Sequence, residues 1–331
     1  MARMRTAIRL LVTAGLLWWG GIGLAQAAEE VRIYTYMLVI QDELTKFLSE
    51  NTGVQVKTLG LSGGELWARV QAEKPNIGAD VLFGFGSGPA ILGKREGLWR
   101  PYPEAPAWRD IHPRYKDKDG YWFDVGTFSF VLVGNKDLLA KKGYKMPESW
   151  FDLLDPKWKG EIVIPSPVSS GTAFMINATF LQLLGWEKGW DFLEKLDKNV
   201  AQYTKSGNAP LEHVGRGEYM LGVTSDEKVP QRLQQGFPIY WSVPKEGIGF
   251  EGNIVAIVKG TKNLEAAKRI VDFAGTEKFQ RWFAQFGYLS ARDAPNPLYP
   301  TKPKFIGYSY DWAADNQARV METWKAKFLR R

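Results

Sequence analysis

Hydrophobic and polar positions along the chain predict strands and helices in turn. A β-branched run at residues 31–36 precedes an amphipathic segment at 41–53, in which apolar side chains recur at helical spacing. The same order, a short apolar run followed by a helical segment, continues through residues 54–98. Because strand and helix alternate, we predict βαβ units, and therefore an α/β protein with a mainly parallel sheet covered by helices on both faces.

Two longer segments break this alternation. Both YWFDVGTFSFVLVGN at 121–135 and KEGIGFEGNIVAIVKG at 245–260 are rich in strand-forming residues and contain glycines. A strand of this kind is able to cross between two lobes, and two crossings imply a discontinuous first lobe. The length of 331 residues allows two domains. We therefore predict lobe one at residues 28–124 and 252–331, and lobe two at 125–251.

The first 27 residues have the features of an export signal. Three arginines precede an apolar run at 10–24, and the run ends in small residues, Ala-Gln-Ala, at 25–27. We expect cleavage after Ala27 and export to the periplasm. A retained membrane anchor is the alternative, but the run is short and broken by glycines, whereas a span needs roughly 20 residues.

Composition excludes several classes of function. The hydrophobic fraction of 45% is that of a globular protein, and the net charge of +7 is spread without a basic block, so we expect no nucleic-acid partner. Zero cysteines exclude disulfides and thiol catalysis. The two histidines, His112 and His213, are far apart in the sequence and form no metal-binding motif. We therefore expect no metal and no cofactor.

The junction between an apolar strand and an apolar helix at Ser169–Thr172 carries the main candidate chemistry. Ser169, Ser170, Gly171 and Thr172 place three hydroxyls and a glycine where the helix begins. A helix N-terminus has free N–H groups and a partial positive charge, and a glycine lets an anion approach them closely. The alternative is a helix cap, which explains one hydroxyl but not the whole set.

Two other strand-to-helix junctions have a similar design. They are Ser62-Gly63-Gly64-Glu65 and the loop 84–88, which includes Gly86 and Ser87. In open α/β sheets ligands bind at the carboxyl ends of strands, where these loops lie. Neither loop has the full pattern of a dinucleotide- or ATP-binding motif, so nucleotide binding is disfavoured.

Two acidic residues and one aromatic residue stand at further predicted strand ends. Asp226 and Glu251 are placed to hold an ammonium or hydroxyl group of a ligand, or are simply solvated loop charges. Tyr36, at the end of the first strand, is a candidate wall of the site. No nucleophile motif is present, so we do not expect an enzyme; a secreted glycoside hydrolase using Asp226 and Glu251 remains a less favoured alternative.

Several segments together resemble the periplasmic substrate-binding proteins of ABC importers. They are TGVQV, SGGELWARVQAEKPNIGADVLFG, SSGTAF, GRGEYMLGVTSDE and EGIGFEGNIVAIVKGTKNLEAAKRIVDFAGTE. The family includes ferric-iron, thiamine, polyamine, and phosphonate or phosphate-ester binders. The resemblance implies a type II periplasmic binding fold with two crossing hinge strands, a ligand between the lobes, hinge closure, and delivery to a membrane permease. We expect a monomer.

The resemblance also indicates a ligand class. Ferric binders use adjacent tyrosines in the second lobe, whereas this chain has Thr224-Ser225-Asp226 there. The segments EGIGFEG and SSGTA are nearer to binders of sugar phosphates or 2-aminoethylphosphonate. This likeness implies a small anionic ligand held by Ser170, Gly171 and Thr172, with further contacts from Tyr36, Ser62, Ser87 and Thr127. Ferric iron, with Tyr34 and Tyr36 as candidate ligands, is the alternative, followed by thiamine or a polyamine.

Overall fold

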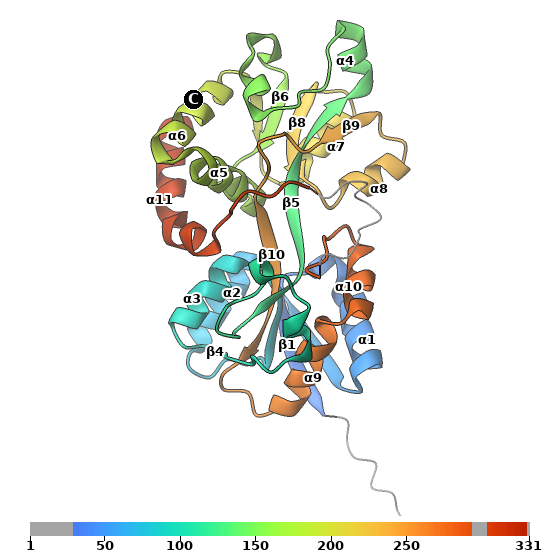
Figure 1. Ribbon diagram of the computed structural model, residues 1–331, viewed down its shortest axis with the longest axis vertical. Coiled ribbons are helices and arrows are strands. Elements are labelled where there is room, and N and C mark those ends of the chain that lie inside the picture. Colours follow the sequence, from blue (N-terminus) through green and yellow to red (C-terminus); the bar gives the residue numbers. More distant parts are fainter. Residues whose placement is uncertain (1–28, 293–302, 330–331) are drawn as a thin grey trace, which may run out of the picture.

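The computed structural model describes residues 29–292 and 303–329. The predicted signal peptide and its cleavage site lie outside the described residues. Two lobes lie one above the other, and two strands, β5 (Phe123–Asn135) and β10 (Phe250–Val258), run between them (Figure 1).

Lobe one is built on the strand order β2-β1-β3-β10-β5. Strands β1 (Glu30–Thr35), β2 (Gln55–Gly60) and β3 (Val81–Phe85) are parallel, while β10 is antiparallel to β3, to β5 and to the short β4 (Trp99–Arg100). Its helices are α1 (Gln41–Thr52), α2 (Gly63–Glu73), α3 (Ser87–Arg95), α9 (Leu264–Ala274) and α10 (Glu277–Ala284). Gly53 ends α1 in the left-handed conformation at φ 67°.

Lobe two continues the sheet as β5-β8-β6-β7, with β9 also paired to β5. Its strands are β6 (Ile162–Pro165), β7 (Val200–Thr204), β8 (Leu221–Ser225) and β9 (Ile239–Ser242). Its helices are α4 (Lys136–Lys142), α5 (Gly171–Leu184), α6 (Trp186–Asp197), α7 (Ala209–Gly215) and α8 (Val229–Gln234). The sequence pattern does not predict β7, because its residues are mostly polar or half-exposed. Short 3-10 turns are η1 (Leu38–Ile40), η2 (Pro106–Arg109), η3 (Pro113–Tyr115), η4 (Trp150–Leu154) and η5 (Pro156–Trp158).

The sheet is mixed rather than mainly parallel. The parallel pairing expected from strand–helix alternation is present among β1, β2 and β3, and between β6 and its neighbours β7 and β8. The crossing strands are antiparallel to their neighbours because each enters a lobe from the other one. Residues 123–129 of β5 pair with β10, and residues 130–134 pair with β8. One strand therefore belongs to both lobes, as the crossing prediction requires.

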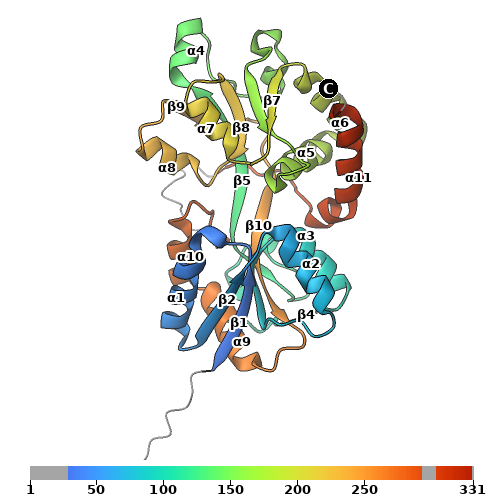
Figure 2. The same cartoon turned by 180° about the vertical axis from the view of Figure 1, so that it is seen from behind.

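The final helix, α11 (Tyr310–Phe328), which the sequence prediction assigned to lobe one, contacts α3 of lobe one and α5 of lobe two. Its second half lies against lobe two, where Trp324 contacts the ring of Tyr203 at 5.2 Å and Phe328 contacts Trp190 at 6.4 Å between centroids. Asp311 and Asp315, in its first two turns, form ion pairs with Arg95 of α3. The burial of its aromatic side chains against α5 and α6 favours this position, so α11 joins the two lobes (Figures 1 and 2).

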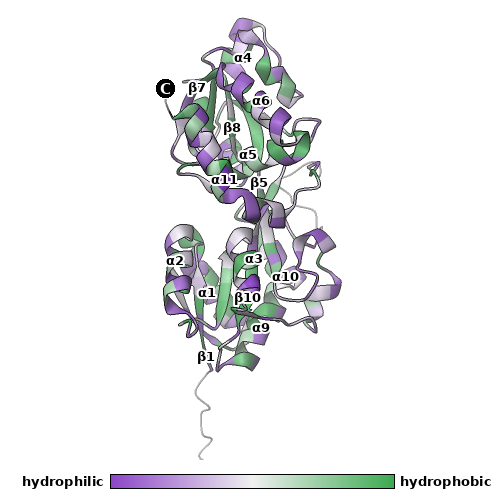
Figure 3. Ribbon diagram, turned by 90° about the vertical axis from the view of Figure 1, so that its left-hand side faces the viewer, coloured by the Kyte–Doolittle hydropathy of each residue, from purple (hydrophilic) through white to green (hydrophobic). Residues whose placement is uncertain are grey.

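Hydrophobic residues concentrate in the strands of both lobes, and the helices turn hydrophilic residues outward (Figure 3). Fully buried side chains include Phe83 and Phe279 in lobe one and Trp158 and Phe180 in lobe two. Within the described ranges, no helix is both long enough and apolar enough to span a bilayer.

Candidate functional site

The predicted site residues follow the carboxyl ends of strands in both lobes. Tyr36, Ser62 and Ser87 come after β1, β2 and β3 of lobe one. The segment 169–172 follows β6 of lobe two, and Asp226 follows β8. These ends face the junction between the lobes, where β5 and β10 cross (Figure 2).

The start of α5 has unused hydrogen-bond donors. Ser170 is the N-cap, and its hydroxyl accepts a bond from the Ala173 amide at 3.3 Å, while the Ser169 hydroxyl donates to the Lys205 carbonyl at 2.9 Å. The amides of Gly171 and Thr172 have no acceptor in residues 29–292 and 303–329. The cap explanation therefore accounts for Ser170, and two N–H groups remain available for an anion.

The other two junctions differ from α5 because each already has a carboxylate at its helix start. At α2, the hydroxyl of Ser62 donates to Glu65 at 2.6 Å and its amide donates at 3.1 Å. These bonds lower the pKa of Glu65, so the carboxylate stays ionised there. At α3, the Ser87 amide donates to Oε1 of Glu251 at 2.7 Å. A carboxylate at a helix N-terminus interacts favourably with the positive end of the dipole and repels a second anion. At α2 it accepts from the N-cap Ser62, and the amides of Gly63 and Gly64 have no acceptor within the described chain.

Glu251 and Tyr36 form part of the lobe-one wall. Burial raises the pKa of Glu251, and hydrogen bonds from Ser87 and from the Gly252 amide partly offset this. A Cβ added at Gly86 would lie 3.8 Å from Glu251, so this glycine adjoins the carboxylate. The Tyr36 hydroxyl donates to Oδ1 of Asn253 at 3.0 Å.

Two predicted ligand residues are buried in the hinge region. Asp226 is 1% exposed, and its Oδ1 accepts a bond from the Ser129 amide of β5 at 2.9 Å. Its carboxylate thus helps to join β8 to the crossing strand. Thr127 is fully buried; its backbone bonds with Leu289, and its hydroxyl has no partner among the described residues.

Further residues at the junction are absent from the sequence prediction. A Cβ added at Gly207 would meet the hydroxyl oxygens of Thr172 at 2.3 Å and Ser170 at 3.2 Å, so the turn after β7 lies against the start of α5. Asn208 of this turn donates to Glu227 at 3.0 Å. The sequence signal for this turn is the Ser-Gly-Asn run at 206–208, which does not differ from an ordinary loop.

The lobes touch at Glu227 and the loop after α10. A Cβ at Gly287, whose φ is +94°, would lie 2.0 Å from the Glu227 carbonyl. The neighbouring Tyr288 stacks on Phe283 with ring centroids 4.4 Å apart. Burial raises the pKa of Tyr288, and the negative charges of Glu227 and Asp226 raise it further. The two walls of the site are therefore adjacent at this point.

Tyr34 does not join Tyr36 at the site. Its hydroxyl donates to Glu73 at 3.1 Å and accepts from Arg69 at 3.2 Å, both residues of α2, whereas Tyr36 lies beyond the end of β1 and donates to Asn253. In the described part of the chain, no group of three or more histidine, aspartate or glutamate side chains is arranged to hold a metal ion.

A family model described as bacterial extracellular solute-binding protein matches residues 79–311. The chain belongs to this family. A probable ABC transporter periplasmic-binding protein, y4fP of Sinorhizobium fredii, is 30% identical over 256 residues, which cover 72% of this chain and 67% of the relative. This confirms the predicted family and supports the role of solute-binding component in an ABC import system.

Solved structures give the same assignment for the fold of this solute-binding protein. The periplasmic binding protein AfuA from Actinobacillus pleuropneumoniae, with fructose 6-phosphate bound, is 33% identical with a TM-score of 0.77, covering 90% of this chain and 98% of AfuA. Apo ferric ion-binding protein A from Pasteurella haemolytica has a TM-score of 0.78 at 20% identity, covering 91% and 98%, and this likeness concerns the fold alone. The predicted type II periplasmic binding fold is confirmed. Members of the family are substrate-binding transport proteins rather than enzymes, and they are extracellular or periplasmic.

Proposed function

We propose that this solute-binding protein captures a small phosphate ester or phosphonate between its lobes and delivers it to a membrane permease. The observation that carries the proposal is the start of α5, where the amides of Gly171 and Thr172 have no acceptor within the described chain. A phosphoryl or phosphonyl group has several acceptor oxygens and a negative charge, and both are favoured at a helix N-terminus.

Gly171 makes this helix start accessible. A Cβ built on it meets no atom within 4 Å, so the space above the amides is open. At α2 and α3 a carboxylate of the protein itself, Glu65 or Glu251, already lies at the helix start and repels a second anion. The anionic head of the ligand is therefore assigned to α5, not to either lobe-one junction.

Carboxylates at the junction suit the other end of such a ligand. Glu251 lies in lobe one, while Glu227 adjoins Asn208 and the turn beside α5 in lobe two. Carboxylate oxygens accept hydrogen bonds from sugar hydroxyls or from an ammonium group. A hexose phosphate and 2-aminoethylphosphonate each carry an anionic head and such donors. AfuA, whose structure holds fructose 6-phosphate, supports the first of these as a probe.

A ferric-iron function fits these residues less well. Tyr34 is bonded to Glu73 and Arg69, so it does not converge with Tyr36. Burial, together with the negative charge of Glu251, raises the pKa of Tyr36 well above its usual value, which disfavours the phenolate that would bind iron. The hydrolase alternative is also weakened, because Asp226 is buried and bonded to Ser129.

Calorimetric titration tests the proposal. The protein is unfolded in denaturant, dialysed to remove bound molecules, refolded, and titrated with fructose 6-phosphate, 2-aminoethylphosphonate and phosphoglycerate. Unphosphorylated fructose and ethanolamine serve as matched controls without the anionic head. Heat with at least one phosphorylated or phosphonate compound and none with its control supports the proposal. No heat with any of the three, or a visible tyrosinate band with ferric citrate, refutes it.

A further inference from the structure

The last helix, α11, is anchored on lobe two. In addition to the aromatic contacts near its C-terminal end described above, the guanidinium of Arg319 lies 3.8 Å from the centroid of the Trp186 ring of α6. Just before the helix begins, the Ser309 amide donates to Oε1 of Gln182 in α5 at 2.7 Å. Because these aromatic and polar contacts all involve lobe two, we expect α11 to move with that lobe.

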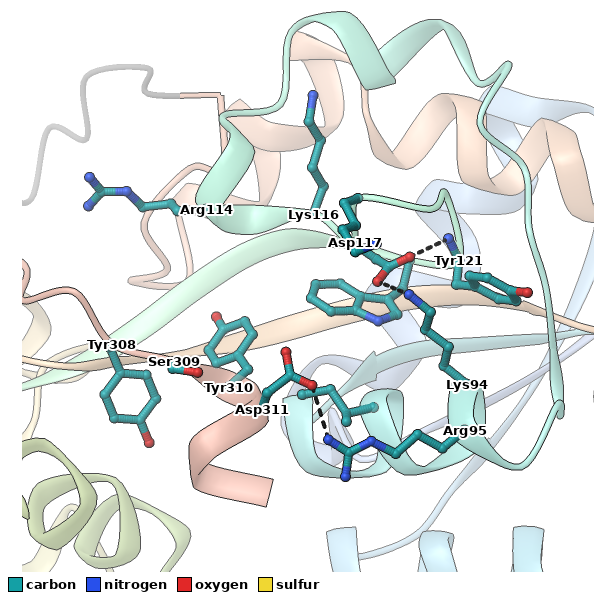
Figure 4. Close-up of a pocket in the computed structure, with 13 residues that line it drawn as sticks. Lys94, Arg95, Arg114, Lys116, Asp117, Tyr121, Tyr308, Ser309, Tyr310 and Asp311 are labelled. Carbon is teal, nitrogen blue, oxygen red and sulfur yellow. Dashed lines mark hydrogen bonds and ion pairs between the residues drawn. The ribbon is translucent and has the colours of Figure 1, made fainter. Parts of the chain in front are cut away.

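An arginine of lobe one reaches across to this helix. Arg95, the last residue of α3, donates through Nη2 to Oδ1 of Asp311 at 3.2 Å. Both of its terminal nitrogens also bond to the carboxylate of Asp315, with Nη2 3.3 Å from Oδ2. Figure 4 shows Arg95 and Asp311 facing each other from the two helices. The hydrogen bonds from Arg95 lower the pKa of Asp315, so this carboxylate stays charged. We call these contacts the α3–α11 ion pairs.

The helix α3 connects the α3–α11 ion pairs with the solute site. It is a single helix of nine residues. At its start, the Ser87 amide donates to Glu251 in the lobe-one wall at 2.7 Å, and at its end Arg95 pairs with α11. A Cβ added at Gly88 would lie 3.8 Å from Oε1 of Gln317, so the first turn of α3 also lies close to α11. The relative position of the two walls of the solute site therefore depends on how α3 is held against α11.

The start of α11 is fixed beside the crossing strands. The Tyr310 hydroxyl donates to Oδ2 of Asp124 on β5 at 2.9 Å, and both side chains are buried. The helices α3 and α11 lie on one side of β5 and β10, and α8 and α10 lie on the other (Figures 1 and 2). A rotation of lobe two about the crossing strands therefore swings the rest of α11 relative to α3. Because a hydrogen bond holds only at a short distance between donor and acceptor, this movement breaks the α3–α11 ion pairs.

We propose that the α3–α11 ion pairs are a latch that holds the two lobes in the arrangement described here, in which the lobes touch. The latch raises the population of this arrangement, and a solute binds more tightly when the arrangement it needs is already populated. The side chains of Arg95 and Asp315 are 44% and 52% exposed, so dissolved salt screens their attraction and weakens the latch. The effect on affinity rests on the proposed function, whereas the effect on the lobes does not.

The distance between the lobes in the ligand-free mature protein tests the latch. The chain has no cysteine, so pulsed EPR can use spin labels at Ala68→Cys in α2 and Lys188→Cys in α6, which are exposed positions of the two lobes. We expect Arg95→Gln to raise the ratio of long to short distances by up to about fivefold, the effect of a favourable exposed ion pair. Arg95→Asp should raise this ratio further by repulsion, and Arg95→Asp combined with Asp315→Arg should restore the wild-type ratio. Arg281→Gln, which removes an exposed ion pair within α10, is the matched control and leaves the ratio unchanged.

Salt and solute titrations complete the test. An increase in NaCl from about 0.05 to about 0.5 M should lengthen the distances in the wild type and leave those of Arg95→Gln unchanged. In calorimetry, Arg95→Gln should raise the Kd for fructose 6-phosphate by up to about fivefold, and the charge swap with Asp315→Arg should lower it again.

The outcomes separate the latch from the proposed solute. If Arg95→Gln has the same distances as the wild type, or if the charge swap fails to restore them, the latch is refuted, whatever the protein binds. If the wild type binds none of the phosphorylated or phosphonate probes, the proposed solute is refuted, and the distances still decide on the latch. Arg95 is exposed, and thermal unfolding of each variant checks that the lobes themselves remain folded.

Discussion

Replacement of Gly171 by proline isolates the contribution of one amide at the start of α5. Gly171 is the first helical residue after the N-cap Ser170. Proline is favoured at this position, because its missing N–H is one that the helix itself does not use. Ser170 has φ −127° and ψ 122°, an extended conformation that a following proline allows. The substitution therefore deletes a hydrogen-bond donor and preserves the helix.

The expected loss of affinity follows from the energy of one hydrogen bond to a charged group. Such a bond contributes about 1.5 to 3 kcal/mol. Since about 1.4 kcal/mol corresponds to a factor of ten, the Kd for a phosphorylated ligand should increase roughly 10- to 100-fold. Stability should be unchanged or slightly higher, because proline restricts the unfolded chain.

Calorimetry on the ligand-free protein measures this effect, with fructose 6-phosphate and 2-aminoethylphosphonate as probes. Gly171→Ala is the matched control, because it adds a Cβ where the structure has open space and keeps the N–H. Thermal unfolding of both variants checks that the fold is intact. If the proline variant binds these probes as tightly as the wild type, the amide does not bind the anion and the reasoning about α5 is wrong.

Three further predictions concern the hinge and the stability of the lobes. Gly287→Ala should weaken solute binding, because the new Cβ meets the Glu227 backbone of the other lobe. It should also increase the radius of gyration of the ligand-bound protein in X-ray scattering. Gly236→Ala is the control: its φ is also positive but its Cβ meets no atom within 4 Å, so neither quantity should change. Burial raises the pKa of Asp124 well above its usual value. The contribution of this carboxyl to the free energy of unfolding is therefore fully present at low pH and is lost as pH rises through the folded-state pKa. In denaturant titrations at several pH values, Asp124→Asn should therefore gain stability relative to wild type as the pH increases, and a constant difference would contradict this. Ser170→Ala should lower the unfolding free energy by about 1 kcal/mol through loss of the cap, whereas Ser170→Gly should cost only a few tenths.

Local patterns in the sequence predict most of the elements correctly. The alternation of apolar runs and helical segments predicts β1 to α3, because each depends on the periodicity of neighbouring residues. The two long glycine-containing strands predict the crossings β5 and β10 for the same reason. The hydroxyl and glycine pattern at 169–172 also marks the junction where the structure has two free amides.

Tertiary structure decided that the start of α3 carries a carboxylate. Glu251 lies 164 residues from Ser87 in the sequence, yet it occupies the start of α3. Asp226 is buried against Ser129, 97 residues away, and so serves the hinge. The helix α11 packs across to lobe two through aromatic side chains near the C-terminus. Helix and strand formation follow from the spacing of nearby residues, whereas these pairings depend on which distant surfaces the folded chain brings within a few ångströms.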